Sequence, residues 1–546
     1  MKKGDILEGK VLKTEFPNKG ILYIEEKKVV VKNALEGQTI RFSVSKKRKD
    51  RVEGRPLEVL APSPLETASQ DRVCQHFGIC GGCAYQTLPY EEQLALKKRQ
   101  VEDLIEKAGF DFPVEDIYGS PIARGYRNKM EYTFGDEEKD GPLALGMHRK
   151  NSFYDIVSLK DCHIADPDFM VILQAVLQYF TSIGASYYHK MRKEGFLRHL
   201  VLRRSVKTGD ILVNLVTTTQ SELDTDAFVQ ALTSAKIDGK IVGILHTLND
   251  SPADVVQSDE TRLLYGQDYF YEYLLNMRFK ISPFSFFQTN TLGAEVLYEK
   301  VGEYVGDTKD KLIYDLYTGT GTIAQMMAPY ARKVVGVEIV EEAVEAARLN
   351  AGDNHLPNCE FIAGDVLKVV DNLTEKPDMI ILDPPRDGVN PKALRKIIRF
   401  GVDEMVYVSC KPTSLMRDLV MLQEAGYAVK RCCLVDMFPM TTGVETVVLL
   451  SKGEIDSKKV RVEFSLEDMD MSGFQKGATY EQIKTYVLEH SGLKVSSLYI
   501  SQVKRKCGLD VGQNYNLSKK EDAKVPQCPP EKERAIRDAL KFFHLI

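Results

Sequence analysis

The sequence predicts a multidomain α/β protein in which a parallel sheet with helices on both faces follows two strand-rich regions. At 546 residues the chain is too long for one hydrophobic core, so three or more domains are expected. From Leu312 onward short apolar segments alternate with helical patterns: LIYDL, KVVGVE, CEFI, DMIIL and EMVYVS. That alternation is typical of a parallel sheet covered by helices.

The first 60 residues read as short strands separated by glycines and predict a small β-barrel. Residues 1–58 carry 15 Lys and Arg against 9 Asp and Glu, a net charge of +6, which leaves −11 for the remainder of the chain. A basic module on an acidic protein indicates a polyanionic partner, although many basic faces are merely solvated.

The middle and the end of the chain have different patterns. Residues 90–108 have helical periodicity, and the region from Gly125 to about Arg278 is rich in strands. Residues 455–546 form a further module with a helical pattern near YEQIKTYVLEH and a basic cluster, VKRK. No run of apolar residues is long enough to span a membrane, and the start MKKGDILEGKV has no apolar signal region, so we expect a cytoplasmic protein.

The segment DLYTGTGTIA, residues 315–324, follows an expected strand and begins a helix. Gly319 and Gly321 allow a tight turn and a close approach to a ligand. The next strand ends at Glu338, which could accept hydrogen bonds from ribose hydroxyls. With Ala324 the loop also satisfies the dinucleotide pattern G-x-G-x-x-A, so the loop alone leaves the cofactor open.

A later segment, DPPRDGV at residues 383–389, decides between these cofactors. An acid at a strand end followed by two prolines makes a rigid corner, for which a dehydrogenase has no evident use. Such a corner is typical of methyltransferases that use S-adenosylmethionine on bases. Asp383 could face the cofactor or the base, and the alternative is an acid that only caps a turn.

Three cysteines, Cys74, Cys80 and Cys83, have the spacing C-x5-C-x2-C in a chain with ten cysteines. Cys162 is the best candidate for a fourth ligand. Four thiolates suit zinc or an iron–sulfur cluster. Zinc sites usually combine two short C-x2-4-C units and only one is present, which favours a [4Fe–4S] cluster.

Cys410, in YVSCKPTSLMRD, ends an expected strand ahead of a helical pattern. A cysteine in such a place is commonly buried and inert. The nucleotide loop and the DPPR corner favour a nucleophile instead, and a helix that begins after Cys410 would favour its thiolate through the helix dipole.

These motifs resemble the RNA uracil-5-methyltransferase family, in its rRNA branch with a TRAM domain and an iron–sulfur cluster. The resemblance runs from Gly4 to about Leu450 and rests on CQHFGICGGC, GYRNKMEY, SPFSFFQTN, DLYTGTGTIA, DPPRDGV, VYVSCKPTSLMRDL and VETVVLL, in that order. It implies a class I (Rossmann-like) methyltransferase domain at 90–119 and 281–453, an OB-like TRAM barrel at 1–60, and a strand-rich iron–sulfur domain at 71–89 and 120–280. A small α+β appendage of unknown role is expected at 455–546.

The resemblance also implies roles for individual residues. Cys410 would be the nucleophile that adds to uracil C6, and Glu445 the base that removes the C5 proton. The contacts to S-adenosylmethionine would come from Gln288, Tyr317, Gly319, Glu338, Asp365 and Asp383, and the contacts to RNA from Arg127, Asn128 and Lys129. The chain departs from many members at Lys411, Met440 and Gly443, which puts details of uracil positioning in doubt.

The sequence thus predicts an enzyme that transfers methyl from S-adenosylmethionine to C5 of a uridine in RNA, with 23S rRNA as the expected substrate. To be reached, the target base would have to leave its stack. A tRNA substrate, a non-catalytic RNA-binding or chaperone protein, and a nicotinamide oxidoreductase are the alternatives.

Overall fold

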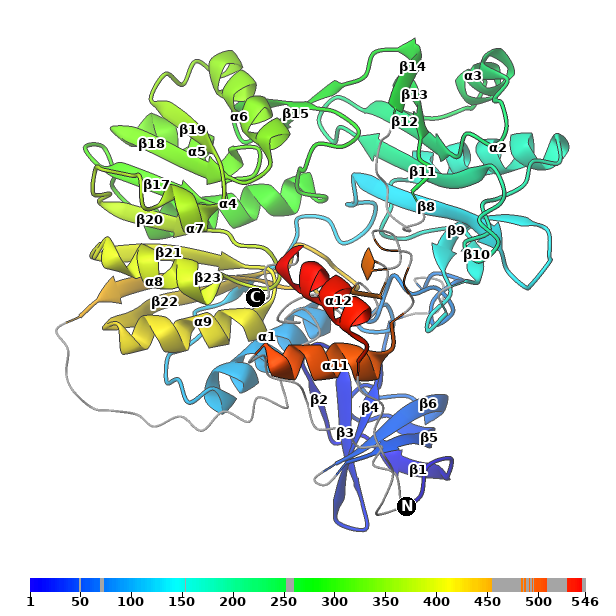
Figure 1. Cartoon of the computed structure of the whole chain (residues 1–546), viewed down its shortest axis with the longest axis horizontal. Coiled ribbons are helices and arrows are strands. Elements are labelled where there is room, and N and C mark those ends of the chain that lie inside the picture. The colour runs from blue at the N-terminus through cyan, green and yellow to red at the C-terminus, as the bar shows by residue number, and fades with distance from the viewer. Residues whose placement is uncertain are drawn as a thin grey trace. The chain divides into compact units, whose positions relative to one another are not determined.

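The chain divides into two compact units, Met1–Val462 and Glu463–Ile546. The computed structural model (Figure 1) describes residues 1–453 apart from 49–50, 69–72, 153 and 252–259, and in the second unit 483–484, 486–487, 491, 493, 495–507 and 528–542. No helix in these ranges has the length and apolar character that a membrane span needs. The finer domain boundaries expected from the sequence stay predictions.

The N-terminal region forms a six-stranded sheet in the order β1-β5-β6-β4-β3-β2. Its strands are β1 Ile6–Lys10, β2 Lys13–Glu15, β3 Lys19–Ile24, β4 Lys27–Lys32, β5 Thr39–Lys47 and β6 Val52–Ala61. Alternation in β5 buries Ile40, Phe42 and Val44 in the core of this sheet. Part of the positive charge is engaged locally, since Arg41 forms ion pairs with both Glu8 and Glu58.

The central region forms a seven-stranded sheet in the order β10-β9-β8-β11-β12-β13-β14. Its strands are β8 Lys129–Asp136, β9 Leu143–His148, β10 Ile156–Ser158, β11 Leu197–Arg204, β12 Asp210–Thr217, β13 Lys240–Leu248 and β14 Glu260–Gly266. Helices α2 (Pro167–Ser182) and α3 (Thr225–Thr233) contribute Phe169, Phe180 and Phe228 to its core. A separate hairpin, β15 Phe270–Leu274 and β16 Met277–Ile281, follows.

The third sheet confirms the expected α/β arrangement. Eight strands follow the order β19-β18-β17-β20-β21-β23-β22-β7. They are β17 Leu312–Leu316, β18 Lys333–Glu338, β19 Cys359–Ala363, β20 Met379–Leu382, β21 Glu404–Ser409, β22 Tyr427–Val435, β23 Glu445–Lys452 and β7 Ile117–Tyr118. The pairs between β17, β18, β19, β20 and β21 are parallel, whereas β23 is antiparallel to both its neighbours.

Helices cover both faces of this sheet (Figure 1). Helix α4 (Thr291–Val305) packs on β21, while α5 (Thr322–Met327) and α6 (Glu341–Asp353) pack on β18, and all three share one hydrophobic core with Val406 and Val408 of β21. On the other face Tyr407 of β21 donates a hydrogen bond of 2.7 Å to Asp418 of α9 (Pro412–Glu424), and α8 (Pro391–Arg399) lies beside α9. Helix α1 (Tyr90–Lys107) packs on α9 and β7, and the short α7 (Val366–Val369) and the 3-10 turn η2 (Ala328–Tyr330) complete the domain.

The second unit is helical where it is described. Helices α11 (Ser497–Lys506) and α12 (Pro530–Phe542) share a core that includes Ile500, Val503 and Ile536. The basic cluster predicted at 503–506 forms the last turn of α11. Any strands of the expected α+β appendage fall outside the described residues, and so does much of the helix expected near YEQIKTYVLEH.

Candidate active site

The carboxyl ends of the parallel strands carry most of the predicted site residues. Asp383 follows β20, Cys410 follows β21, and Glu445 begins β23. Ser409 pairs with Thr446 in the antiparallel ladder between β21 and β23, so Cys410 and Glu445 face each other one position further on. Ligands of α/β sheets bind at this edge.

Burial dominates the electrostatics of this group. It raises the pKa of the Cys410 thiol to about 12, with the nearby carboxyls of Glu445 and Asp383 raising it further. The same effect raises the pKa of Glu445 to about 8, with a contribution from Asp383, and the pKa of Asp383 to about 7, with a contribution from Asp315. The predicted contribution of the helix dipole to the Cys410 thiolate stays a prediction, and burial acts against it by raising the pKa of this thiol.

Arg386 is the cation of this site, and its role was missed in the sequence although DPPR contains it. It lies close enough to lower the pKa of both Cys410 and Glu445, in the case of Cys410 partly through a hydrogen bond. Its side chain is exposed, while its backbone carbonyl accepts a hydrogen bond of 2.7 Å from Ser414. A position between solvent and the buried thiol suits a group that meets an incoming anion.

The glycine loop is organised around two acids. Glu338 accepts from the N–H groups of Gly319, Ile339 and Val340 at 3.1, 2.8 and 3.0 Å, which fixes its carboxylate at the end of β18. Asp315, a second residue without a predicted role, accepts from Thr318 and Ala324 through Oδ2. Its Oδ1 is buried with no hydrogen-bond partner among the described residues.

The remaining predicted cofactor residues lie at the same edge. Tyr317 follows β17 in the left-handed region, with φ 71°, and the carboxyls of Asp365, Asp418 and Glu338 raise the pKa of its buried hydroxyl after burial itself. Asp365 caps α7 by accepting from Leu367 N–H at 2.9 Å.

Gln288 lies near Tyr298, a buried tyrosine of α4 whose pKa is raised by burial and by Asp383 and lowered by a hydrogen bond with Gln288. The Asn128 amide donates to the Gln288 carbonyl at 3.0 Å and to the Thr291 hydroxyl at 2.9 Å. Asn128 is buried, so its predicted contact with RNA is corrected to a structural role, while those of Arg127 and Lys129 stay predictions.

The four predicted ligand cysteines come together from two parts of the chain. Burial raises the pKa of the Cys83 thiol to about 12, and Cys162, Cys80 and Cys74 are near enough to raise it further. Within the described ranges, however, no group of three or more His, Cys, Asp or Glu side chains is arranged to hold a metal ion.

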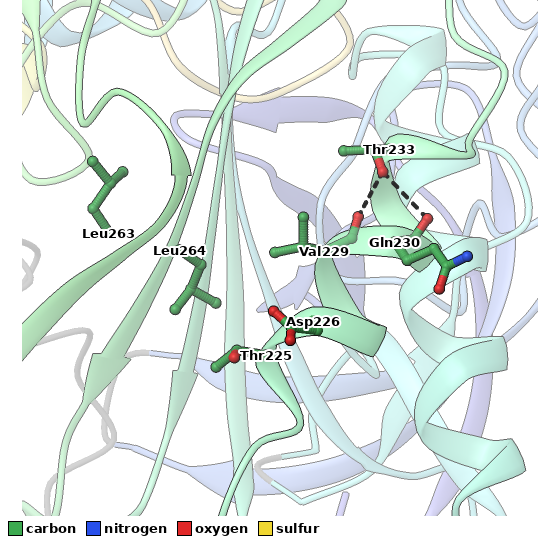
Figure 2. A pocket seen from close by; sticks show the side chains of 7 residues that line it. All are labelled: Thr225, Asp226, Val229, Gln230, Thr233, Leu263 and Leu264. Atoms are coloured by element: carbon green, nitrogen blue, oxygen red, sulfur yellow. Dashed lines mark hydrogen bonds between the residues drawn. The ribbon is translucent and has the colours of Figure 1, made fainter.

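A hollow of about 450 Å³ lies elsewhere, between α3 and β14 (Figure 2). Its lining comes from Thr225, Asp226, Val229, Gln230 and Thr233 of α3 and from Leu263 and Leu264 of β14. The Thr233 hydroxyl is used within the helix, where it donates to the carbonyls of Val229 and Gln230. None of the predicted site residues lines this hollow, so it is separate from the chemistry described above.

The chain is similar to known proteins over most of its length. The sequence model of one family, described as tRNA (Uracil-5-)-methyltransferase, matches residues 89–453. An uncharacterized RNA methyltransferase of Clostridium tetani is 49% identical over 83% of this chain and 99% of its own length, and one of Clostridium acetobutylicum is 48% identical with the same coverage. The crystal structure of the Pyrococcus abyssi tRNA (uracil-54, C5)-methyltransferase with S-adenosyl-L-homocysteine is similar at 28% identity and TM-score 0.65, over 81% of this chain and 100% of that one.

Proposed function

Since the chain belongs to the tRNA (uracil-5-)-methyltransferase family and is an S-adenosylmethionine-dependent RNA (uracil-5-)-methyltransferase, we propose that Cys410 and Glu445 methylate C5 of a specific uridine through a covalent intermediate. The observation that carries this proposal is the proximity of the Cys410 thiol to the Glu445 carboxyl, beyond the last pair of the β21–β23 ladder, Ser409 with Thr446. The non-catalytic and nicotinamide alternatives give no reason for this pair.

In the proposed reaction Cys410 acts as the nucleophile and Glu445 as the base. Cys410 Sγ bonds to C6 of the uracil, which makes C5 nucleophilic, and the methyl group that S-adenosylmethionine supplies is transferred to C5. Glu445 then takes the C5 proton, the C5–C6 double bond re-forms, and the bond between C6 and Cys410 breaks. A carboxyl group whose pKa is about 8 is well matched to this proton transfer near neutral pH.

Because the thiol of Cys410 has a raised pKa, it must release its proton to solvent as the substrate binds. Arg386 is the group that favours this ionisation, since its guanidinium stabilises the thiolate. The same cation would attract the phosphates or the uracil oxygens of the incoming RNA.

The acids at the strand ends suit a positively charged methyl donor. Asp315, which is buried with an unpartnered Oδ1 among the described residues, lies near the partly buried carboxyl group of Asp383. A sulfonium and an α-ammonium group would offset their charges, while Glu338 is placed for ribose hydroxyls. We propose that S-adenosylmethionine is bound by the residues predicted from the sequence and by one more, Asp315. The predicted residues are Gln288, Tyr317, Gly319, Glu338, Asp365 and Asp383.

For the four cysteines we propose a [4Fe–4S] cluster that is structural. The proposal is supported by the proximity of the four thiols and by the backbone N–H groups of His76 and Gly82, which donate to Cys74 Sγ and Cys80 Sγ, each at 3.4 Å. Hydrogen bonds of this kind stabilise thiolate ligands. Iron and sulfide analysis of the purified protein, against a Cys83→Ser variant, tests this assignment.

The proposed substrate is 23S rRNA, and the β-rich N-terminal module is proposed to act as a TRAM domain that holds RNA phosphates. The similarity to an enzyme named for tRNA uracil-54 keeps tRNA as the alternative. Mass spectrometry of 5-methyluridine in rRNA and tRNA, from cells with and without the gene, distinguishes the two.

The covalent mechanism is tested with RNA that contains 5-fluorouridine. The fluorine cannot be removed as a proton, so the protein should remain bonded to RNA on a denaturing gel when S-adenosylmethionine is present. The band should be absent in Cys410→Ala and retained in Cys359→Ala, because Cys359 stands at the amino end of β19 whereas Cys410 follows the carboxyl end of β21 in the same parallel arrangement. A wild-type protein that methylates RNA and yet forms no band would contradict the mechanism.

A further inference from the structure

The loop that precedes Glu445 accepts hydrogen bonds from two other segments of the chain. Residues Asp436–Val444, here called the base loop, connect β22 to β23 and end directly before Glu445. Val435 pairs with Glu445 across the hairpin, so the position of the Glu445 carboxyl depends on how this loop closes. The base loop contacts residues that lie close in the sequence to two of the four cysteines, Cys83 and Cys162.

The first connection begins at Cys83. The next two residues, Ala84 and Tyr85, both donate their backbone N–H to the Met440 carbonyl, at 2.8 and 3.0 Å. Met440 has a left-handed backbone with φ 67°, which is costly for a side chain of this type and must be held by such contacts. The Met440 side chain is buried in a small cluster that Cys83 and Cys162 pack against.

The second connection begins at Cys162. Gly125 N–H donates to the His163 carbonyl, and Arg127 N–H donates to the Ile164 carbonyl, each at 2.9 Å. Tyr126 lies between these two bonds and is buried, and its hydroxyl donates to the Pro439 carbonyl at 3.0 Å. Cys162 is thus linked to the base loop through one tyrosine.

We propose that the four-cysteine site positions the general base, with Tyr126 and Met440 as positioning residues that fix the base loop. The proposal rests on the proposed function, in which Glu445 takes the C5 proton. The two connections tie the Pro439 and Met440 carbonyls to the segments that contain Cys83 and Cys162, so Glu445 is held towards Cys410. The nucleophile itself, on β21, does not depend on this loop.

Tyr126→Phe tests the proposal by removing one oxygen atom. Tyr427→Phe is the matched control, because its hydroxyl is also buried and donates to a backbone carbonyl, that of Val402 at 2.7 Å, at the other end of β22. Two quantities are measured on each full-length protein: trapping by 5-fluorouridine RNA, which needs Cys410 but no C5 proton transfer, and decay of the covalent intermediate on uridine RNA, which needs Glu445. The variant Glu445→Gln serves as a reference for the decay of the intermediate in a protein without the base.

We expect Tyr126→Phe to slow the decay of the intermediate about fivefold, the effect of one lost hydrogen bond, with trapping unchanged. Tyr427→Phe should leave both quantities at the wild-type level. An unchanged decay in Tyr126→Phe, or equal losses of trapping and decay, would overturn the proposal. Absence of trapping in the wild type would instead refute the proposed function.

The link to the cysteines is tested by hydrogen exchange. In Cys83→Ser the amides of the base loop should exchange faster than in the wild type, while those of α9 stay unchanged. Base-loop exchange that stays at the wild-type rate in Cys83→Ser would overturn the proposed coupling. If Cys83→Ser does not fold, the comparison of Tyr126→Phe with Tyr427→Phe still decides whether the base loop positions Glu445.

Discussion

The side-chain ammonium group of Lys97 lies 2.7 Å from the carboxylate of Asp436, and both side chains are completely buried. Lys97 belongs to α1, and Asp436 is the first residue of the base loop, directly after β22. The pair therefore fixes α1 to the base loop, although the two residues are 339 positions apart in the sequence. Lys97 also donates to the Phe438 carbonyl at 3.1 Å, within the same loop. Burial lowers the pKa of Lys97, and the charge of Asp436 opposes this shift.

Removing this cation should destabilise the protein strongly. Lys97→Met leaves Asp436 buried without its partner, so we expect the free energy of unfolding to fall by about 3–5 kcal/mol. Lys98→Met is the matched control, because Lys98 is the next residue on α1 and lies 3.9 Å from Asp116 with both side chains partly exposed. That change should cost at most about 0.5 kcal/mol. Urea unfolding measures both, and similar losses in the two variants would contradict the prediction.

The pH dependence of the base step should depend on Arg386. The guanidinium favours the carboxylate of Glu445 and so lowers a pKa that burial has raised to about 8. Without the cation this pKa rises, and the base is ionised only at higher pH. In Arg386→Ala the pH profile for decay of the covalent intermediate should therefore move to higher pH. Arg395, on the neighbouring α8, serves as the control in Arg395→Ala. A profile that moves to lower pH would refute the assigned role.

The buried acids should make stability depend on pH. Asp383 has a pKa of about 7 in the folded protein, above the usual value of 3.8, so the folded state holds a proton that the unfolded state releases. The resulting loss of stability appears as pH rises through this window. Asp383→Asn should therefore have a higher Tm than the wild type at pH 8, and this difference should vanish near pH 4. Thermal unfolding of both proteins across this range provides the measurement, and a difference that grows towards acid pH would contradict it.

The glycine loop should not accept a side chain at Gly321. Its φ is 74°, and a Cβ atom there would lie 2.6 Å from the Phe361 ring and 2.9 Å from the Ala347 Cβ. Gly321→Ala should lower the free energy of unfolding by about 1–2 kcal/mol from the backbone alone and weaken binding of S-adenosylmethionine. Gly352→Ala, in α6 with no atom within 4 Å of the new Cβ, should be neutral or stabilising. Denaturation and calorimetric titration test both, and wild-type affinity in Gly321→Ala would contradict the role of this loop.

Much of the site could be predicted because its residues stand directly at the ends of strands. Apolar runs such as DMIIL and EMVYVS determine buried parallel strands, and the polar residue after each run, Asp383 or Cys410, must then lie at the carboxyl edge of the sheet. The glycines of the loop after β17 could also be interpreted from the sequence, since glycine adopts a φ such as the 74° of Gly321 without the steric cost that a Cβ atom brings.

The sequence by itself therefore determined the α/β class and the strands. It also determined that the reactive side chains stand at the ends of these strands. Only the tertiary structure decided the environment that raises the pKa of Cys410, because its burial and the nearby charges of Glu445 and Asp383 come from separate parts of the sheet. The tertiary structure likewise decided that the buried Asn128 donates a hydrogen bond to the Gln288 carbonyl and that Lys97 forms an ion pair with Asp436. These contacts join residues far apart in the chain, and their energies depend on desolvation, which no local pattern encodes.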